Sequence, residues 1–273
     1  MIRRLRGLIV VVAGLLALTS AAPALAGTFD DWAAVVVAGD WHAHSGGPSE
    51  AFDNARRDVS RALVDIGFQK DNIRQFSVRP ERYRDGPLKS DPKVIYQSLG
   101  ELAGRASGGC LVYFSSHGAP QGVVVDQIIL PPGILAAMID RTCGARPTVV
   151  VISACFSGVF IPQLAGANRM ILTAARPDRT SFGCGEADKY PYFDDCFLQT
   201  VRKSQDFPGL ASQVQACVAA REAKEGMTPP SEPQLWIGPA LRPMLPLLAF
   251  SPASGAPSVV CKAKPDPATR SCS

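Results

Sequence analysis

The chain alternates between short runs of aliphatic and β-branched residues and longer stretches in which apolar residues recur every three or four positions. The short runs predict buried strands, and the longer stretches predict amphipathic helices. Strands are expected at residues 33–38, 73–78, 110–114, 149–152 and 169–174, with an edge strand at 234–237. Helices are expected at residues 49–66, 92–104, 134–141, 160–164, 193–201 and 210–225, with a surface excursion at 79–92 and a hairpin at 121–130. This order predicts an α/β fold in which helices cover both faces of a parallel sheet.

The first 26 residues have the pattern of an export signal. Arginines at positions 3, 4 and 6 precede an apolar run at 8–18, and Ala24-Leu25-Ala26 forms a small-x-small cleavage site. The apolar run is shorter than the ~20 residues that a membrane-spanning helix needs. We therefore expect a periplasmic or secreted protein with no membrane contact after signal removal.

The remaining chain is expected to be one domain at 27–238, followed by a Pro-rich tail at 239–273. The whole chain has 28 basic and 24 acidic residues. Without the three signal arginines the balance is 25 to 24, and no basic run remains. Nucleic acid is therefore not an expected partner.

Two predicted strands end next to residues that can do chemistry together. His117 follows the strand at 110–114, and Cys155 follows the strand at 149–152. The segment between them is long enough for one crossover with its helix, so both strands can run in parallel and end at the same edge of the sheet. An imidazole beside a thiol helps to form the thiolate, which is the reactive nucleophile.

These two strand ends also carry a family resemblance. The blocks YFSSHG at 113–118 and VVVISACFSG at 149–158 resemble the His-Gly and Ala-Cys-x-Ser-Gly blocks of legumain-like cysteine peptidases, which are relatives of the caspases. The similarity extends over roughly residues 33–197. It implies a caspase-like three-layer sandwich with a mostly parallel central sheet.

The same resemblance implies a mechanism. Cys155 is expected to attack a peptide carbonyl and form an acyl-enzyme, with His117 moving the protons. The backbone N–H groups of Gly118 and Cys155 are the expected oxyanion donors. The loop at 175–195 is expected to contact a peptide or protein substrate, and no cofactor is expected.

The resemblance is incomplete at the residues that give legumains their preference for asparagine. Legumains use an arginine from the loop after the first strand, an acid two residues before the nucleophile, and a later aspartate. This chain has Ser153 at the acid position, Ala51 or Phe52 near the arginine position, and Asp195 as the match to the aspartate. We take Ser153, Asp195 and Asp40, at the end of the first strand, as substrate-binding candidates and leave the P1 residue open.

Two alternatives use the same residues differently. A transamidase would pass the acyl group to an amine with the same His117 and Cys155, and an inactive peptidase-like module would bind without reacting. An α/β-hydrolase is excluded by chain order, because in that fold the nucleophile precedes its histidine. The same order argues against Ser157 as the nucleophile.

Seven cysteines remain besides Cys155, and export makes disulfides plausible. We expect pairs Cys261–Cys272 and Cys184–Cys196, and the odd number leaves at least one more thiol free or paired between chains. His42 and His44 have a spacing that could suit a metal, but no third ligand is evident in the sequence, so no metal site is expected.

Overall fold

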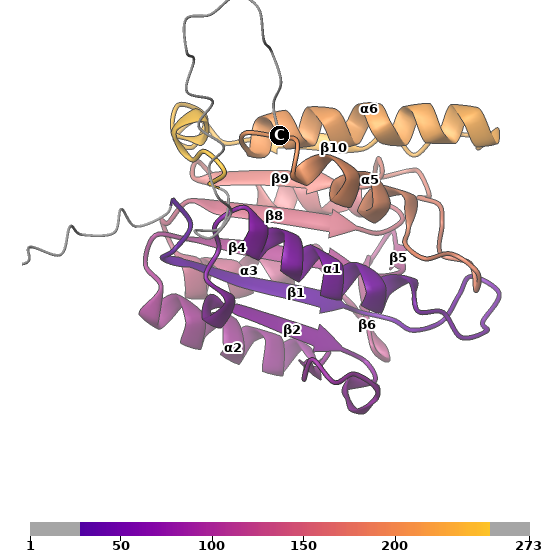
Figure 1. Cartoon of the computed structure of the whole chain (residues 1–273), viewed down its shortest axis with the longest axis horizontal. Helices are drawn as coiled ribbons and strands as arrows, with labels where there is room; N and C mark the ends of the chain where they lie inside the picture. Colours follow the sequence, from indigo (N-terminus) through magenta and orange to yellow (C-terminus); the bar gives the residue numbers. More distant parts are fainter. Residues whose placement is uncertain (1–27, 252–273) are drawn as a thin grey trace, which may run out of the picture.

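Seven strands form the central sheet of the computed structural model, which describes residues 28–251 (Figure 1). The strands are β1 (Trp32–Ala38), β2 (Ile73–Ser77), β3 (Leu88–Lys89), β4 (Gly109–Ser115), β8 (Thr148–Ser153), β9 (Arg169–Thr173) and β10 (Gln234–Ile237). Their order is β10-β9-β8-β4-β1-β2-β3, and only β10 pairs in the antiparallel sense. The predicted strands and the edge strand are confirmed, with no end shifted by more than one residue.

Helices cover both faces of this sheet, as predicted for a three-layer sandwich (Figure 1). The α-helices are α1 (Ala51–Asp65), α2 (Pro92–Arg105), α3 (Pro132–Cys143), α4 (Ile161–Leu164), α5 (Tyr192–Val201) and α6 (Phe207–Glu225). Short 3₁₀ turns lie at Lys70–Asn72, Pro80–Arg82, Ser157–Phe160 and Leu245–Leu247. Helix α6 begins three residues before its predicted start, because Asp206 caps it by accepting a hydrogen bond from Gly209 N–H at 2.7 Å.

The alternation of side chains along the strands divides the core in two. In β1, Ala34 and Val36 pack with α1, α5 and α6, whereas Val35 and Val37 pack with α2 and α3. Every residue of β1 is buried. This is why the strands appear in the sequence as continuous apolar runs instead of alternating patterns.

A second sheet lies beside the carboxyl ends of β4 and β1. It consists of β5 (Gly118–Ala119), β6 (Gly122–Val125) and β7 (Ile128–Leu130). The predicted hairpin is therefore present and gains a third strand directly after His117. Ser116 Oγ donates to Val124 O at 2.8 Å, and Asp126 N–H donates to Gly39 O at 2.8 Å. These bonds fix the small sheet against the edge at which the central strands end.

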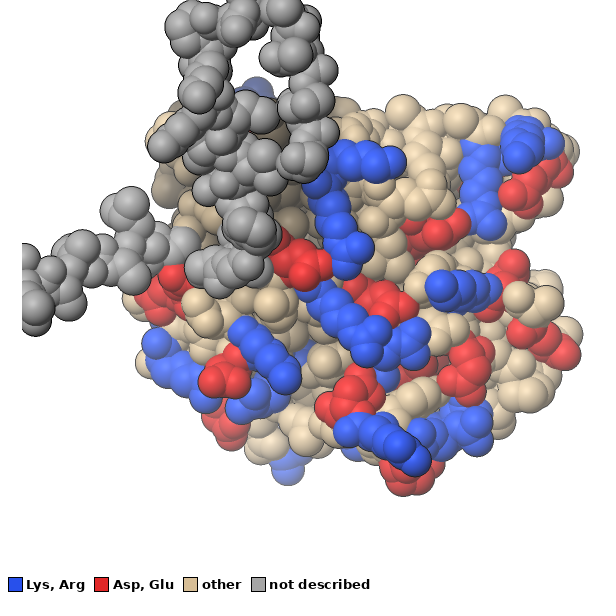
Figure 2. Space-filling view, viewed as in Figure 1, with Lys and Arg blue, Asp and Glu red and all other residues tan. Residues whose placement is uncertain are grey.

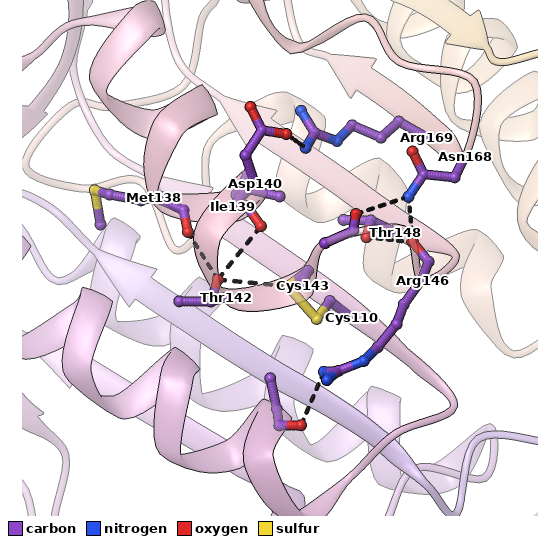
Figure 3. The surroundings of a disulfide bond; sticks show 12 residues. Cys110, Met138, Ile139, Asp140, Thr142, Cys143, Arg146, Thr148, Asn168 and Arg169 are labelled. Carbon is purple, nitrogen blue, oxygen red and sulfur yellow. Dashed lines mark hydrogen bonds and ion pairs between the residues drawn. A yellow bond between two sulfur atoms is a disulfide. The ribbon is translucent and has the colours of Figure 1, made fainter.

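Two disulfides connect regular elements. Cys110 on β4 is bonded to Cys143 at the end of α3, where the Thr142 hydroxyl lies 3.7 Å from the Cys143 sulfur (Figure 3). Cys196 on α5 is bonded to Cys217 on α6. The predicted Cys184–Cys196 pair is therefore wrong.

The error has a structural cause. Cys196 points from a helix into the core, whereas Cys184 lies in the loop between β9 and α5 as a free thiol. The predicted pair of Cys261 and Cys272 lies outside the described residues, as does the predicted export signal.

The chain continues to pack on the core after β10. Leu241 and Leu245 are both 1% exposed and belong to the cluster beneath α5 and α6. These two leucines, which belong to the predicted tail, thus pack on the core. Within residues 28–251, no helix combines the length and apolar character needed to cross a bilayer.

Charges on the face that carries α1 are mixed in sign (Figure 2). Asp58 accepts from both Arg57 and Arg61 at 2.9 Å, and Arg202 pairs with Asp65 at 2.5 Å. Exposed pairs of this kind contribute little to the free energy of unfolding. Basic side chains on this face are therefore interspersed with acids.

Candidate active site

His117 and Cys155 occupy equivalent positions beyond two neighbouring parallel strands. β4 and β8 pair from Cys110 with Thr148 to Ser115 with Ser153, which is the last pair in the register. Ser116 N–H continues the ladder by donating to Ser153 O at 3.0 Å. His117 and Cys155 each lie two residues beyond the last pair, so the predicted meeting of two strand ends at one edge is confirmed.

Gly118 lies directly against the Cys155 backbone. A Cβ atom at residue 118 would be 2.1 Å from the carbonyl oxygen of Cys155 and 3.0 Å from Ala154 Cβ. No side chain fits there, so the glycine permits a close approach of the two backbone segments. The His-Gly motif therefore has a packing reason in this fold.

The His117 ring has a defined tautomer. Its Nε2 atom lies 3.0 Å from the backbone oxygen of His42, and because a carbonyl can only accept, Nε2 carries the proton. In the neutral ring this leaves Nδ1 without a proton and able to act as a base. The Phe52 ring packs edge-on against the imidazole, with centroids 5.0 Å apart.

Asp40 holds the turn that presents the His42 carbonyl. Its Oδ1 accepts from Trp41 N–H at 2.6 Å and from His42 N–H at 3.1 Å, and His42 Nδ1 is 2.7 Å away. A carboxylate that accepts backbone N–H groups one and two residues later is a common way to fix a tight turn. The Asp40 side chain is thus engaged inside the loop after β1.

The turn that follows Cys155 is unusually tight. Phe156 is in the left-handed region with φ 57° and ψ 12°, a conformation that non-glycine residues seldom adopt. Its N–H donates to Arg179 O at 2.7 Å, and a Cβ atom at Gly158 would lie 2.5 Å from the Pro177 ring. Strained backbone of this kind concentrates at functional sites. The turn brings the loop after β9 against the cysteine.

Ser181 in that loop contacts the Cys155 sulfur. Its backbone N–H donates to Cys155 Sγ at 3.3 Å, and its carbonyl oxygen lies 3.5 Å from the sulfur. The backbone of the loop therefore holds the sulfur from one side. The loop was expected from the resemblance, but nothing in the sequence distinguished Ser181 from its polar neighbours.

A second thiol lies near the first. The pKa of Cys184 is raised to about 11, chiefly by burial and then by the charge of Cys155. Cys184 O accepts from His44 N–H at 3.2 Å, so the loops after β1 and β9 are joined at this point. In the part of the chain that the structure describes, no three His, Cys, Asp or Glu side chains form a group that could hold a metal ion.

The two adjacent aspartates at the start of α5 point in different directions. Asp195 pairs with Arg221 of α6 at 2.6 Å. Asp194 is wholly buried and accepts hydrogen bonds from Tyr113, Ser115 and Ser153. Asp195 was the predicted candidate and Asp194 was not, because the rotation of a short helix cannot be read from two consecutive acids.

Burial has the largest effect on the pKa of Asp194. It raises the pKa of this carboxyl to about 6, although the three hydroxyl donors favour the ionised form. The carboxyl in turn raises the pKa of Tyr113 well above its usual range, after the larger effect of burial. Ser153, the substrate-binding candidate two residues before Cys155, is therefore bonded to a buried acid.

Comparisons with known proteins agree with this fold. The model of the peptidase C13 family, the legumain family, matches residues 34–227. Caspase-1 from Spodoptera frugiperda superimposes with a TM-score of 0.57 at 16% identity, over 78% of this chain and 88% of that chain. That structural likeness supports the fold alone. The search of curated proteins returned no match. Since the family model spans well over half of the sequence, the chain belongs to the peptidase C13 family of cysteine peptidases.

Proposed function

We propose that the protein is a cysteine endopeptidase in which Cys155 is the nucleophile and His117 is the general base and acid. The observation that carries this proposal is the parallel register of β4 and β8, which sets His117 and Cys155 at equivalent positions beyond Ser115 and Ser153. Membership of the C13 family supports the same reaction class.

The first half of the reaction forms an acyl-enzyme. His117 Nδ1 takes the thiol proton, and the sulfur attacks the peptide carbonyl carbon while the π electron pair moves to oxygen. When the tetrahedral intermediate collapses, the C–N bond breaks and the imidazolium gives its proton to the leaving amine. The second half repeats these roles: His117 deprotonates a water whose oxygen attacks the thioester carbonyl, the C–S bond breaks, and the imidazolium returns its proton to the sulfur.

The intermediate oxyanion needs donors that are already in position. The backbone N–H groups of Gly118 and Cys155 are the proposed donors, because the two backbone segments pack at close range. Both are main-chain groups on short segments that follow β-strands. They therefore cost little reorganisation during the reaction.

Support for the dyad comes from the loop after β1. Asp40, selected from the sequence as a substrate contact, is better suited to holding the His42 carbonyl that fixes the His117 tautomer. Ser153 is 2% exposed and its hydroxyl donates to Asp194, so we assign it to holding that carboxylate and not to contact with the P1 side chain. Asp195 is the weakest of the three candidates, because its carboxylate is engaged by Arg221.

The proposed substrate is a peptide or protein outside the cytoplasm. The basic and apolar pattern of residues 1–26 supports export, and the two disulfides are compatible with a periplasmic or extracellular protein. The enzyme rather than the binding-module alternative is favoured, because the module would need neither the thiol nor the oriented imidazole.

The test is covalent labelling with peptidyl electrophiles that differ at P1. The adduct is located by intact mass and peptide mapping in the wild type, in His117→Ala, and in Cys184→Ser as the control for the neighbouring thiol. We expect an adduct on Cys155 that requires His117 and persists in Cys184→Ser. Mass spectrometry of cleaved peptides with the best P1 residue then separates hydrolysis from transfer to an added amine.

A folded protein that forms no adduct on Cys155 with any member of the panel contradicts the proposal and favours a binding module. An adduct of equal rate in His117→Ala contradicts the dyad alone.

A further inference from the structure

The carboxylate of Asp194 joins the ends of the two strands that carry His117 and Cys155. Its Oδ2 atom accepts from Ser115 Oγ at 2.8 Å and from Ser153 Oγ at 2.8 Å. These serines are the last paired residues of β4 and β8 and lie opposite each other in the register. One oxygen atom therefore bridges both strands, two residues before each reactive side chain.

The bridge is enclosed on all sides. Asp194, Ser115 and Ser153 are at most 2% exposed, so water does not compete for the hydrogen bonds. The third donor, the Tyr113 hydroxyl, contacts the other oxygen at 2.5 Å. Asp194 lies in the first turn of α5, where the helix dipole favours a negative charge.

The arrangement is energetically expensive for a merely structural role. Among residues 28–251 the structure gives Asp194 no ion-pair partner, and burying a carboxylate without one raises its pKa. An apolar side chain at the same place would fill the space without that cost. Costly buried polar groups are expected where function requires a fixed geometry.

We propose that Asp194 is a positioning residue that sets the separation of His117 and Cys155 by bridging Ser115 and Ser153. This inference rests on the proposed function, because it concerns the same two side chains. Asp194 touches neither of them and acts only through the strand ends.

The bridge has a specific signature in a double-mutant cycle. Loss of either serine hydroxyl breaks the same connection, so the two losses should not multiply. We expect Ser115→Ala and Ser153→Ala each to lower kcat about tenfold, and the double variant to lower it by about the same factor, since small misplacements of reacting groups are costly. KM should stay within about twofold, because substrate binding is not the affected step.

Ser60→Ala is the matched control. Ser60 is a buried serine of α1 whose hydroxyl donates to Arg56 O at 2.8 Å, away from the strand ends. Ser60→Ala should lower the free energy of unfolding about as much as Ser115→Ala and Ser153→Ala do, and it should keep wild-type kcat. All variants are compared at a temperature at which thermal unfolding shows each of them to be folded.

Alkylation of Cys155 by iodoacetamide at neutral pH, followed by peptide mapping, separates this inference from the proposed function. It needs no substrate, and we expect the rate to fall in the serine variants in parallel with kcat. A wild type that cleaves no peptide but shows His117-dependent alkylation overturns the peptidase proposal only. Three results overturn the bridge: wild-type kcat in both serine variants, a roughly hundredfold multiplicative loss in the double variant, or a rise in KM at unchanged kcat.

Discussion

The two halves of the candidate site are held in different ways. His117 and Cys155 follow buried parallel strands that are tied by a hydrogen-bond ladder and by the Asp194 bridge. The other half consists of the loops after β1 and β9, which meet through single bonds such as His44 N–H to Cys184 O. We call these two halves the strand half and the loop half.

This difference indicates that the two halves have different functions. The strand half contributes the reacting atoms, and the loop half contributes the groups that orient and cover them, namely the His42 carbonyl and the Ser181 backbone. Rigid elements are suited to precise placement of reacting groups, while loops supply adaptable contacts. Perturbing the strand half should therefore alter the free energy of unfolding most, and perturbing the loop half should alter catalysis most.

The largest expected effect is on stability and comes from the disulfide between α5 and α6. Cys196 and Cys217 close a segment of 21 residues, so replacing both with alanine should lower the free energy of unfolding by about 3 kcal/mol. Equilibrium urea unfolding measures the change. Cys184→Ala is the control, because it removes a thiol without opening a disulfide. A double-alanine variant as stable as that control would mean that helix packing alone fixes the position of α5.

The second effect is on catalysis and comes from the loop half. Asp40→Ala removes the acceptor that holds the turn before the His42 carbonyl, so His117 loses its fixed orientation. We expect kcat to fall by about a hundredfold, within the range that general acid–base groups contribute. The free energy of unfolding should change by only about 1 kcal/mol.

Asp206→Ala is the matched variant for this measurement. Asp206 also accepts a backbone N–H, at the start of α6, but it does not contact the site. It should lose comparable stability and retain kcat. Equal losses of kcat in both variants would show that the effect of Asp40 is general destabilisation.

The strand half could be predicted from the sequence, because it depends only on where the buried parallel strands end. Runs such as Cys110–Phe114 are too apolar and too short for anything but buried strands, and parallel strands must end at one edge. That rule brings His117 and Cys155 together without knowledge of any side-chain contact. The helices followed from their apolar periodicity in the same way.

The loop half and the bridge could not be predicted, because they depend on contacts between residues far apart in the chain. Ser181 reaches Cys155 across 26 positions, and Asp194 reaches Ser153 across 41. The choice between Asp194 and Asp195 depended on the rotation of α5, and the disulfide of Cys196 depended on the same rotation. No local propensity fixes that angle.

The third expected effect is a pH dependence of the free energy of unfolding that comes from the buried Asp194. The pKa of Asp194 rises from its ordinary 3.8 to about 6 on folding, so the folded state holds the extra proton between these values. The contribution of Asp194 to the free energy of unfolding is complete below pH 3.8. It is lost as the pH rises through 6, and the total loss is about 2 to 3 kcal/mol. Asp194→Asn lacks this loss, because its amide does not ionise.

The measurement is the difference in free energy of unfolding between Asp194→Asn and the wild type at pH 4 and at pH 8. The variant should gain relative stability at the higher pH. Asp195→Asn is the control, because its carboxylate is half-buried and paired with Arg221. A pH-independent difference for Asp194→Asn would mean that the pKa of Asp194 does not change on folding.

The smallest effect concerns the loop half and the second thiol. Cys184 has a pKa of about 11, mainly because it is buried, so little thiolate forms at pH 8. A basic thiolate is also a stronger nucleophile, which offsets part of the deficit, and the net rate with iodoacetamide should be about tenfold below that of an exposed thiol such as glutathione.

Peptide mapping of Cys155→Ala measures the reaction of Cys184 without interference from Cys155. Removing the Cys155 charge should speed the reaction only slightly, because burial is the larger cause of the raised pKa. If Cys184 reacted as fast as glutathione, the loops after β1 and β9 would open readily, and the division between a rigid strand half and an adaptable loop half would be sharper than the contacts imply.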